Sequence, residues 1–308
     1  MKIFLAGHKG LVGSAILKKL KQKGYKKIIT ANKSKLNLLN QSSVNNFLKK
    51  KKPQIVIIAA ARVGGILANS KYGGKFIYEN LQIQNNLIHF SYKNNIKNLI
   101  FLGSSCIYPK YSKQPIKEKY LLSGKLEETN EPYAVAKIAG IKMCEAYNKQ
   151  YKTNYKCLMP ANSYGPNDNY HLLNSHFFPG LIHKAHVCKI KNKKNIIVWG
   201  SGRPFRELIF VDDIAEACIF FMNKKTKDSL INIGTGKDMS IKDYTKFILR
   251  KLDLKIKIKF NKSIPDGIYR KLLNISKAKK YGWKAKTSLD MGFDITYENF
   301  KKKFKHLK

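Results

Sequence analysis

Arginine and acidic residues are both scarce in this sequence. Only five of the 60 basic residues are arginine, and 19 aspartates and glutamates leave a formal charge of +41. A surface that reads phosphates or bases usually relies on arginine, because its planar guanidinium binds them through two parallel hydrogen bonds. The lysines are also spread along the whole chain, beside abundant isoleucine and asparagine. This pattern favours codon drift in an AT-rich genome over a specific nucleic-acid surface.

Long apolar runs and closely spaced cysteine pairs are absent as well. The longest clearly apolar run, at residues 55–61, is too short to span a bilayer, and the start MKIFLAG lacks the apolar segment of a secretory signal. Five cysteines without a CxxC pair indicate a reducing compartment. His183, His186 and Cys188 lack an obvious further ligand for a metal, so we expect helix-surface residues there. We therefore expect a cytoplasmic protein with no metal centre and no membrane partner.

Apolar runs alternate with helical patterns through the first half of the chain. Continuous apolar runs are typical of strands covered on both faces, and they fall at residues 2–7, 26–31, 54–60, 98–103 and 155–161. Helical patterns fall between them, near 12–23, 43–50, 76–94 and after Pro132. This alternation predicts an α/β fold with a doubly wound parallel sheet. A strand that enters a helix at 206–222 and a short strand at 229–236 extend the pattern.

The amino-acid composition of the sequence changes after about residue 162. Residues 163–204 are rich in asparagine, histidine, glycine and aromatics, and the last 70 residues are mixed and rich in lysine. We therefore expect two domains. Residues 1–162 and 205–232 form a nucleotide-binding domain, and residues 163–204 and 233–308 form a smaller α/β substrate-binding domain.

A glycine-rich turn follows the first predicted strand. The segment GHKGLVG places Gly7, Gly10 and Gly13 between a strand and a helix. Glycine permits a tight turn, a close approach of backbone to a pyrophosphate, and helix–sheet packing, while the helix N-terminus attracts the phosphate charge. The spacing is GxxGxxG rather than GxGxxG, so the strand–turn–helix context carries the prediction of a dinucleotide site.

The end of the second predicted strand indicates which dinucleotide is bound. A NAD site usually offers a carboxylate there to the ribose hydroxyls, yet residues 30–39 contain none. Lys33 lies in this segment and Lys9 lies inside the glycine turn, and both can pair with a 2′-phosphate. The sequence therefore favours NADP(H) over NAD.

A reacting group is predicted at Tyr133 and Lys137. Their spacing of four places both on one face of a helix that Pro132 starts well. An ammonium beside a phenol stabilises the phenolate and lowers the pKa of the tyrosine, so Tyr133 can give a proton to a carbonyl that receives hydride. The segment GSSCIYP, about 30 residues upstream, adds Ser104 and Cys106 at the end of a predicted strand.

Further motifs occur along the chain: GSSCIYPK, NEPYAVAKIAGIKMCEAYN, NSYGP, NSHFFPGLI, IVWGSGRPFRELIFVDD, INIGTG and PDGIYRKLL. Together with the glycine turn they resemble the GDP-L-fucose synthase family, the epimerase–reductase branch of the extended short-chain dehydrogenases. The resemblance covers about residues 3–300. It implies a Rossmann fold and an enzyme that converts GDP-4-keto-6-deoxy-D-mannose to GDP-L-fucose with NADPH.

The resemblance also implies the catalytic residues. Ser104 and Tyr133 hydrogen-bond the keto oxygen of the sugar, and Cys106 and His176 form the acid–base pair of the epimerisation. This chemistry is reasonable, because a 4-keto group acidifies the protons on C3 and C5, and inversion needs a base on one face and an acid on the other. A thiol and an imidazole both titrate near neutral pH when tuned. NADPH then reduces C4, with Tyr133 as proton donor and Lys137 beside it.

Binding residues and oligomeric state are implied in the same way. The cofactor residues are Gly7, His8, Lys9, Gly10, Leu11, Val12, Gly13, Lys33, Leu102, Gly103, Ser104, Ser105, Lys137, Pro160, Ala161, Asn162, Ser163 and His176. The GDP-sugar residues are Asn162, Lys184, Trp199, Arg206, Asp266 and Lys271. Lys9, Lys33 and Lys184 replace arginines of the family, which keeps the charge but loses the guanidinium fork. A homodimer through helices near 76–94 and 133–150 is expected.

Other functions stay open on the sequence. A 4,6-dehydratase needs an acid–base carboxylate pair just after the serine, and SSCIY has none. A 4-epimerase or a plain 4-ketoreductase does not need Cys106 together with His176. A non-catalytic protein that binds NADP or RNA is suggested by the charge, but it need not keep Ser104, Tyr133 and Lys137. A related 4-keto sugar with a colitose-like product also fits the motifs.

Overall fold

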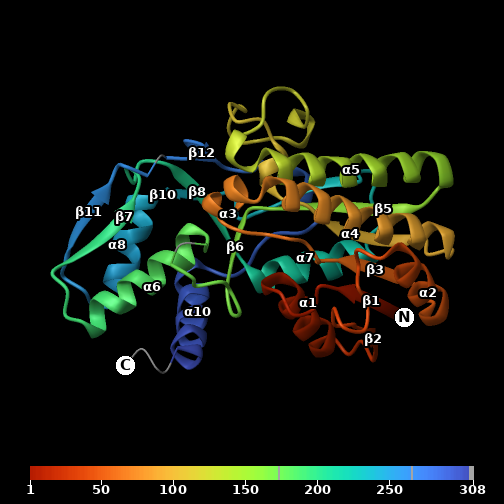
Figure 1. The fold of residues 1–308 in the computed structure, drawn as a ribbon, viewed down its shortest axis with the longest axis horizontal. Coiled ribbons are helices and arrows are strands. Elements are labelled where there is room, and N and C mark those ends of the chain that lie inside the picture. The colour runs from red at the N-terminus through yellow and green to blue at the C-terminus, as the bar shows by residue number, and fades with distance from the viewer. Residues whose placement is uncertain (173, 265, 305–308) are drawn as a thin grey trace.

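The structure is a computed structural model that describes residues 1–172, 174–264 and 266–304 (Figure 1). Within these residues a parallel sheet of six strands runs in the order β2–β1–β3–β4–β5–β9. The strands are β1 (Lys2–Ala6), β2 (Lys27–Ile29), β3 (Ile55–Ile58), β4 (Asn98–Leu102), β5 (Asn154–Pro160) and β9 (Leu230–Ile233). Every neighbouring pair is parallel, so the predicted sheet is confirmed.

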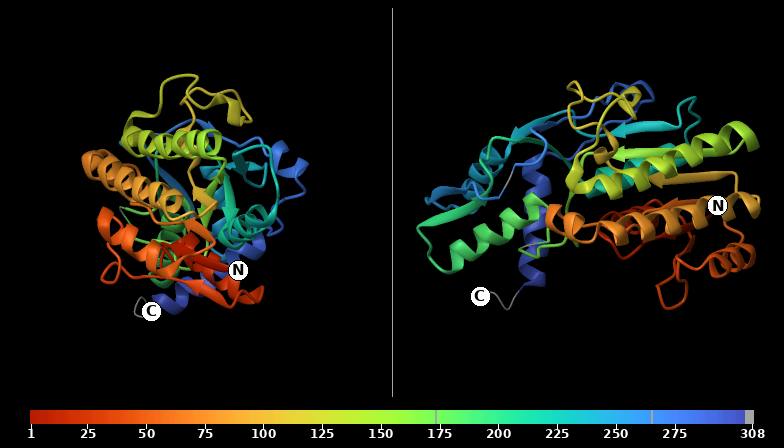
Figure 2. Two further views of the ribbon diagram at one scale, coloured as in Figure 1. Left: turned by 90° about the vertical axis from the view of Figure 1, so that its right-hand side faces the viewer. Right: turned by 45° about the horizontal axis from the view of Figure 1, so that its top comes forward.

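Two layers of helices cover this sheet, which is why its strands are mostly apolar. On one face α1 packs against α7, and on the other α4 packs against both α2 and α5. Figure 2 shows the sheet between these layers when the molecule is viewed end-on. The helices are α1 (Leu11–Gln22), α2 (Gln41–Lys51), α4 (Gly73–Lys93), α5 (Glu131–Tyr151) and α7 (Val211–Asn223). The helices predicted in the first half of the chain are confirmed. A short helix, α3 (Ile66–Lys71), precedes α4.

A second lobe lies beyond the carboxyl ends of the parallel strands (Figure 1). In it β8 (Phe205–Phe210) pairs with β10 (Asp238–Ser240), β12 (Arg270–Lys271) and β6 (Asn162–Tyr164), while β7 (Asn195–Trp199) pairs with β11 (Lys257–Asn261). The helices are α6 (Phe177–Ile190), α8 (Ile241–Lys251) and α10 (Leu289–Lys303). Their aromatic side chains form a separate core around Phe178, Tyr244 and Phe293.

The chain between β4 and α5 contains three short 3₁₀ helices. They are η1 (Ser105–Ile107), η2 (Glu118–Tyr120) and η3 (Glu128–Asn130). Ile116 from this segment bridges to Leu273, just after β12. The segment that follows the predicted catalytic serine therefore lies beside the residues that follow β12.

The predicted domain boundaries stay a prediction. The described residues contain two buried apolar clusters, one around the parallel sheet and one in the second lobe. Leu273, Ile275, Ala278 and Trp283 pack in the first cluster, although the prediction gives them to the smaller domain. The reason is that α9 (Ser276–Lys280) returns to lie against β9. In the described part of the chain, no helix is long and apolar enough to cross a membrane.

Candidate active site

The glycine turn after β1 leaves no room for side chains. Gly7 has φ of +89°, and Gly10 donates its N–H to the Gly7 carbonyl at 3.1 Å. A Cβ on Gly13 would lie 2.0 Å from the Gly7 carbonyl oxygen, and a Cβ on Gly7 would lie 2.5 Å from the nitrogen of Ala60. Gly10 caps α1 without a side-chain hydrogen bond, and the first turn holds no acidic residue. The N–H groups at this helix start are therefore available to a phosphate.

A pocket of about 300 Å³ lies beside this turn. It is at the carboxyl ends of β1 and β3, where the strand order reverses direction, which is the usual place for a nucleotide. Its lining is Gly7, His8, Lys9, Gly10, Ala31, Asn32, Lys33, Leu36, Asn37, Leu38, Leu39, Ala60, Glu79 and Ile83. The structure thus brings predicted Lys9 and Lys33 together, and the tight turn, the open helix end and the two lysines fit NADP(H).

Several pocket residues were missed by the sequence analysis. Asn32 and Asn37 lie inside segment 30–39, whose lack of carboxylates indicated a cofactor site. The two asparagines themselves were not predicted to line it. Glu79 comes from α4 and pairs with Arg62 at 3.1 Å. Nothing in the local sequence pattern identifies Glu79 as a pocket residue. Of the predicted residues, Leu11, Val12 and Gly13 begin α1 and are not among the residues that line the pocket.

The other predicted cofactor residues gather at the ends of β4 and β5. These strands are neighbours, with Leu102 paired to Leu158, and Gly103 donates its N–H to the Leu158 carbonyl at 3.0 Å. Ser105 follows Gly103 and Ser104 in a buried position. Pro160, Ala161, Asn162 and Ser163 continue from β5 into β6, and the Asn162 amide donates to the Glu207 carbonyl at 2.9 Å.

Ser104 and Cys106 lie where β4 passes into η1. The Ser104 hydroxyl accepts the N–H of Cys106 at 3.4 Å, and Cys106 is buried. Burial raises the pKa of the Cys106 thiol, while the charge of Lys271, a hydrogen bond with Ser104 and the charge of Lys137 oppose the rise. The thiol therefore lies close to two cationic side chains from different parts of the chain.

Tyr133 and Lys137 lie one turn apart near the start of α5. The Lys137 ammonium donates to the Leu102 carbonyl at 2.9 Å and lies 5.8 Å from the centre of the Tyr133 ring. Burial lowers the pKa of Lys137 to about 8. Burial also raises the pKa of Tyr133, and the negative charge that Cys106 can carry adds to the rise.

The expected lowering of the Tyr133 pKa by Lys137 is therefore wrong for this structure. The physical reason is that the protein around Tyr133, which is half-buried, disfavours its charged form, while the ammonium of the buried Lys137 is hydrogen-bonded to Leu102 rather than to the phenol. A raised pKa still suits the expected role, because it keeps the phenol protonated until a carbonyl oxygen needs the proton.

His176 caps the N-terminus of α6 and makes no side-chain capping bond. Part of the residue is exposed to solvent. The nearby protein atoms still displace water from the imidazole, which lowers the pKa of His176, and the charge of Lys271 lowers it further. Lys271 therefore acts on both His176 and Cys106. Near neutral pH the thiol keeps its proton and the imidazole is free to accept one, which is the state that an acid–base pair needs.

The predicted substrate residues form two small groups. The Lys184 ammonium lies 4.3 Å above the Trp199 ring and donates to the Ile197 carbonyl at 3.1 Å. Asp266 accepts the Ser201 N–H at 2.8 Å and the Ser201 hydroxyl at 2.5 Å, so it fastens the turn after Trp199.

Arg206 and Lys271 make up the second group. They lie opposite each other in the pairing of β8 with β12. Arg206 donates to the carbonyls of Phe205 and Ile268 at 2.7 and 2.6 Å. Burial lowers the pKa of Arg206 to about 10, although the charges of Asp266 and Glu127 oppose this. Glu127, which the sequence analysis missed, forms an ion pair with Lys110 at 3.1 Å, and its charge also opposes the lowering of the Lys271 pKa.

The expected surface position of Cys188 is wrong because the residue is buried, and that of His183 and His186 is wrong as well. Both are half-buried: His183 Nδ1 lies 2.7 Å from the Tyr170 carbonyl and His186 Nδ1 lies 2.8 Å from the Tyr297 hydroxyl. α10 packs over them, which a sequence pattern did not reveal. Over the described ranges, no group of three or more histidine, cysteine or acidic side chains is placed to hold a metal ion.

Comparisons with known proteins agree with this geometry. The model of the NAD dependent epimerase/dehydratase family matches residues 3–234. A putative GDP-L-fucose synthase 2 of Arabidopsis thaliana is 48% identical over 96% of this chain and 90% of its own length, and the GDP-L-fucose synthase of Escherichia coli K12 is 45% identical over 97% and 96%. The structure of a Campylobacter jejuni GDP-mannoheptose C4 reductase with NADP bound is 38% identical, with a TM-score of 0.89 over 97% of this chain and 98% of that one.

The site and the comparisons indicate the same family. The site has a glycine turn that suits a dinucleotide and a tyrosine–lysine pair beside a serine, and the matches cover nearly the whole chain. The chain belongs to the NAD dependent epimerase/dehydratase family and, within it, to the GDP-L-fucose synthases.

Proposed function

We propose that this chain converts GDP-4-keto-6-deoxy-D-mannose to GDP-L-fucose, by epimerising C3 and C5 and then reducing C4 with NADPH. The observation that carries the proposal is the thiol of Cys106, which lies within electrostatic reach of Tyr133, Lys137 and Lys271 next to Ser104. A plain reductase has no use for a thiol at this place. The names of the curated relatives support the same reaction.

Epimerisation uses Cys106 and His176 as the acid–base pair. The ketone at C4 makes the protons on C3 and C5 acidic, because the carbanion formed on either carbon is an enolate. One member of the pair removes a proton while the other returns one from the opposite face. Ser104 and Tyr133 stabilise the enolate oxygen by hydrogen bonds. The nearby positive charge of Lys271 offsets part of the cost of a charged thiolate in a buried place.

Reduction uses Tyr133 and Lys137. NADPH supplies the hydride to C4. Tyr133 gives its proton to the C4 oxygen, and the Lys137 ammonium, which is hydrogen-bonded to the Leu102 carbonyl and lies 5.8 Å from the centre of the Tyr133 ring, adds positive charge on that side of the site. Arg206 and Lys271 supply positive charge for the diphosphate, while Lys184 and Trp199 hold the more distant part of the nucleotide.

A C4 reductase for another GDP-sugar is the second candidate. The specific observation in its favour is the 38% identity to a GDP-mannoheptose C4 reductase over nearly the whole chain. The two functions share Ser104, Tyr133 and Lys137. They differ in whether hydrogen on C3 and C5 exchanges with solvent.

The test is turnover of GDP-4-keto-6-deoxymannose with NADPH in D₂O, followed by NMR of the product. We expect NADPH oxidation and deuterium at both C3 and C5. A Cys106→Ser variant should lose the deuterium, while Cys188→Ser, a buried thiol of α6 hydrogen-bonded to the Asn195 carbonyl, should keep it. NADPH oxidation without deuterium would establish the second candidate and contradict the first.

The division into two domains, a cytoplasmic location and a homodimer are parts of the proposal. The five cysteines are all free and buried, which supports a reducing compartment. The neighbouring helices α4 and α5 are proposed as the dimer face, where Tyr78 and Val135 are 62% and 40% exposed. Sedimentation equilibrium would show a mass twice that of one chain, and a Tyr78→Glu variant would sediment as a monomer.

A further inference from the structure

The strand that carries Lys271 is very short. β12 contains Arg270 and Lys271 alone and pairs in parallel with β8, where Arg270 lies opposite Phe205 and Lys271 opposite Arg206. The Phe205 N–H adds a bond of 2.7 Å to the Tyr269 carbonyl. Two residues of parallel strand give few ladder bonds, so side chains from elsewhere decide where Lys271 lies.

Glu207 holds the residues after β12 from the β8 side. Its side chain is completely buried. One carboxylate oxygen accepts the Leu273 N–H at 2.8 Å, and the other accepts the Gly236 N–H at 2.7 Å. A Cβ on Gly234 would lie 2.2 Å from that second oxygen, so the loop after β9 packs directly against the carboxylate. Glu207 thus ties β8, the loop after β9 and the end of β12 to one another.

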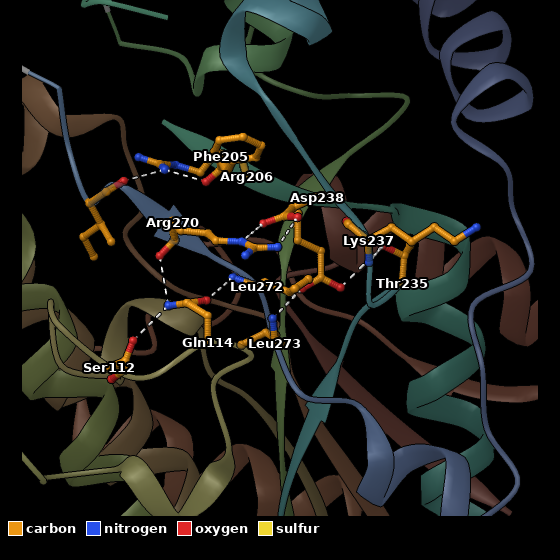
Figure 3. Close-up of polar contacts among 12 residues, drawn as sticks. Ser112, Gln114, Phe205, Arg206, Thr235, Lys237, Asp238, Arg270, Leu272 and Leu273 are labelled. Carbon is orange, nitrogen blue, oxygen red and sulfur yellow. Dashed lines mark hydrogen bonds and ion pairs between the residues drawn. The ribbon is translucent and has the colours of Figure 1, made fainter. Parts of the chain in front are cut away.

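Gln114 holds the same strand from the opposite side (Figure 3). Its side-chain oxygen accepts the Leu272 N–H at 2.9 Å, and its side-chain nitrogen donates to the carbonyls of Arg270 and Ser112 at 3.1 Å. Arg270 itself forms two bonds with Asp238, at 2.6 and 3.0 Å. Successive side chains of a strand alternate in direction, so Lys271 points away from the Arg270–Asp238 pair.

Gln114 and Glu207 hold β12 through different hydrogen-bonding groups. Gln114 meets one N–H and two carbonyls, which an amide satisfies in full. Glu207 meets two backbone N–H groups and a Thr235 hydroxyl at 3.4 Å, and all three can donate to a carboxylate. An amide at position 207 would turn its own NH₂ toward one of the backbone N–H groups. Burial raises the pKa of Glu207 to about 7, and these hydrogen bonds oppose the rise because they favour the carboxylate. Glu207→Gln would release one of the two attachments.

We infer that Glu207 is a positioning residue, which fixes β12 so that the Lys271 ammonium faces Cys106 and the nucleotide sugar. The inference rests on the proposed function, because that function makes Lys271 a substrate contact. Glu207 acts on Lys271 through the backbone that follows it, and its other oxygen holds the loop after β9. Its loss should therefore weaken sugar-nucleotide binding and leave the dinucleotide pocket beside Gly7 unchanged.

The test is a double-mutant cycle on binding. The dissociation constant of GDP-mannose, which has no keto group and so does not react, is measured by calorimetry for the wild type, Glu207→Gln, Lys271→Ala and the double variant. We expect Glu207→Gln to weaken binding about 10-fold, as loss of a hydrogen bond to a charged group does. The double variant should bind no more weakly than Lys271→Ala alone, and NADPH affinity should be unchanged in all four.

Asp213 provides a matched control. It is also a buried carboxylate that accepts two backbone N–H groups, those of Lys286 and Thr287 at 3.0 and 3.1 Å. Asp213→Asn makes the same chemical change away from β12, so it should lower stability without weakening GDP-mannose binding. If Glu207→Gln does not fold, Gln114→Ala releases the same strand from its other side and should weaken binding severalfold.

Four results would overturn the inference. Effects of Glu207→Gln and Lys271→Ala that add in the double variant would show that Glu207 does not act through Lys271. Equal weakening by Asp213→Asn would show a general loss of stability instead. A wild type that binds GDP-mannose while Glu207→Gln binds it equally well would overturn the inference alone. A wild type that binds NADPH but no GDP-mannose would overturn the proposed function and the inference with it.

Discussion

A buried carboxyl at Asp168 should make this protein less stable as the pH rises. Asp168 lies in the loop after β6 and is 4% exposed. One of its oxygens accepts the Asn169 N–H at 2.7 Å, and the other has no hydrogen-bond partner among the residues described. Burial raises the pKa of Asp168 to about 7, although the Asn169 N–H and the charge of Lys303 oppose the rise.

The sign follows from proton binding. Between the ordinary value of 3.8 and about 7 the folded chain keeps this proton while the unfolded chain has lost it. The free energy of unfolding therefore falls as the pH rises through this range and levels off above it. At 1.36 kcal/mol for each pKa unit, the contribution of Asp168 should fall by about 2.5 kcal/mol between pH 5 and pH 8.

Asp168→Asn removes this titration and keeps an oxygen for the Asn169 N–H. Guanidinium chloride unfolding of both proteins at half-unit steps from pH 5 to pH 8 gives the difference in stability at each pH. The free energy of unfolding of the variant minus that of the wild type should rise by about 2.5 kcal/mol from pH 5 to pH 8. The cost of burying the NH₂ group is the same at every pH, so it does not affect this rise. Any other group that titrates in both proteins cancels in the difference.

Asp253→Asn is the control, because Asp253 is exposed and Asn tolerates its φ of +53°. It removes a carboxylate from an exposed site, so it measures how much of the difference arises without burial. If the curves of wild type and Asp168→Asn run parallel within about 0.5 kcal/mol, Asp168 titrates normally in the folded chain, and the reasoning from its burial fails.

Three further predictions concern the dinucleotide site and the reacting lysine. Gly13→Ala should lower the free energy of unfolding in guanidinium chloride by about 3 kcal/mol or more, because the new Cβ would clash with the backbone of Gly7. Gly74→Ala, where no atom lies within 4 Å of the new Cβ, should raise it by about 0.5–1 kcal/mol. Lys33→Ala should raise the KM for NADPH about 5-fold and leave that for NADH unchanged; equal changes would place the 2′-phosphate elsewhere. The pKa of Lys137 in the free enzyme, about 8, predicts that kcat/KM falls as the pH rises through 8, and Lys137→Arg should move the fall to higher pH; an unmoved fall would assign it to another group.

The parallel sheet could be predicted because burial on both faces leaves a signature in the sequence. Every residue of β3 (Ile55–Ile58) is buried and apolar. The strands of the second lobe were harder to predict from the sequence. β6, β10 and β12 are two or three residues long, and their partners are distant in sequence. β11 does alternate exposed lysines with half-buried Ile258 and Phe260, which was a signal that went unused.

The site divides in the same way. Tyr133 and Lys137 could be predicted because their spacing is a property of one helix. His176 required the resemblance to a family, because a single histidine at a helix start has no distinctive spacing. Glu207 could not be predicted at all: its partners, Gly236 and Leu273, are 29 and 66 residues away and contribute only backbone N–H groups, which every sequence has.

The return of the chain to the first apolar cluster limits how this enzyme can be rebuilt. Leu273, Ile275, Ala278 and Trp283 lie beyond β12 in sequence, yet they complete the core around the parallel sheet. A fragment ending after β9 would expose the apolar surface that these side chains cover. Grafting the substrate-recognising half of a relative onto this scaffold would likewise need several junctions at once. Changes of sugar specificity are therefore more accessible by point substitution than by exchange of a contiguous segment.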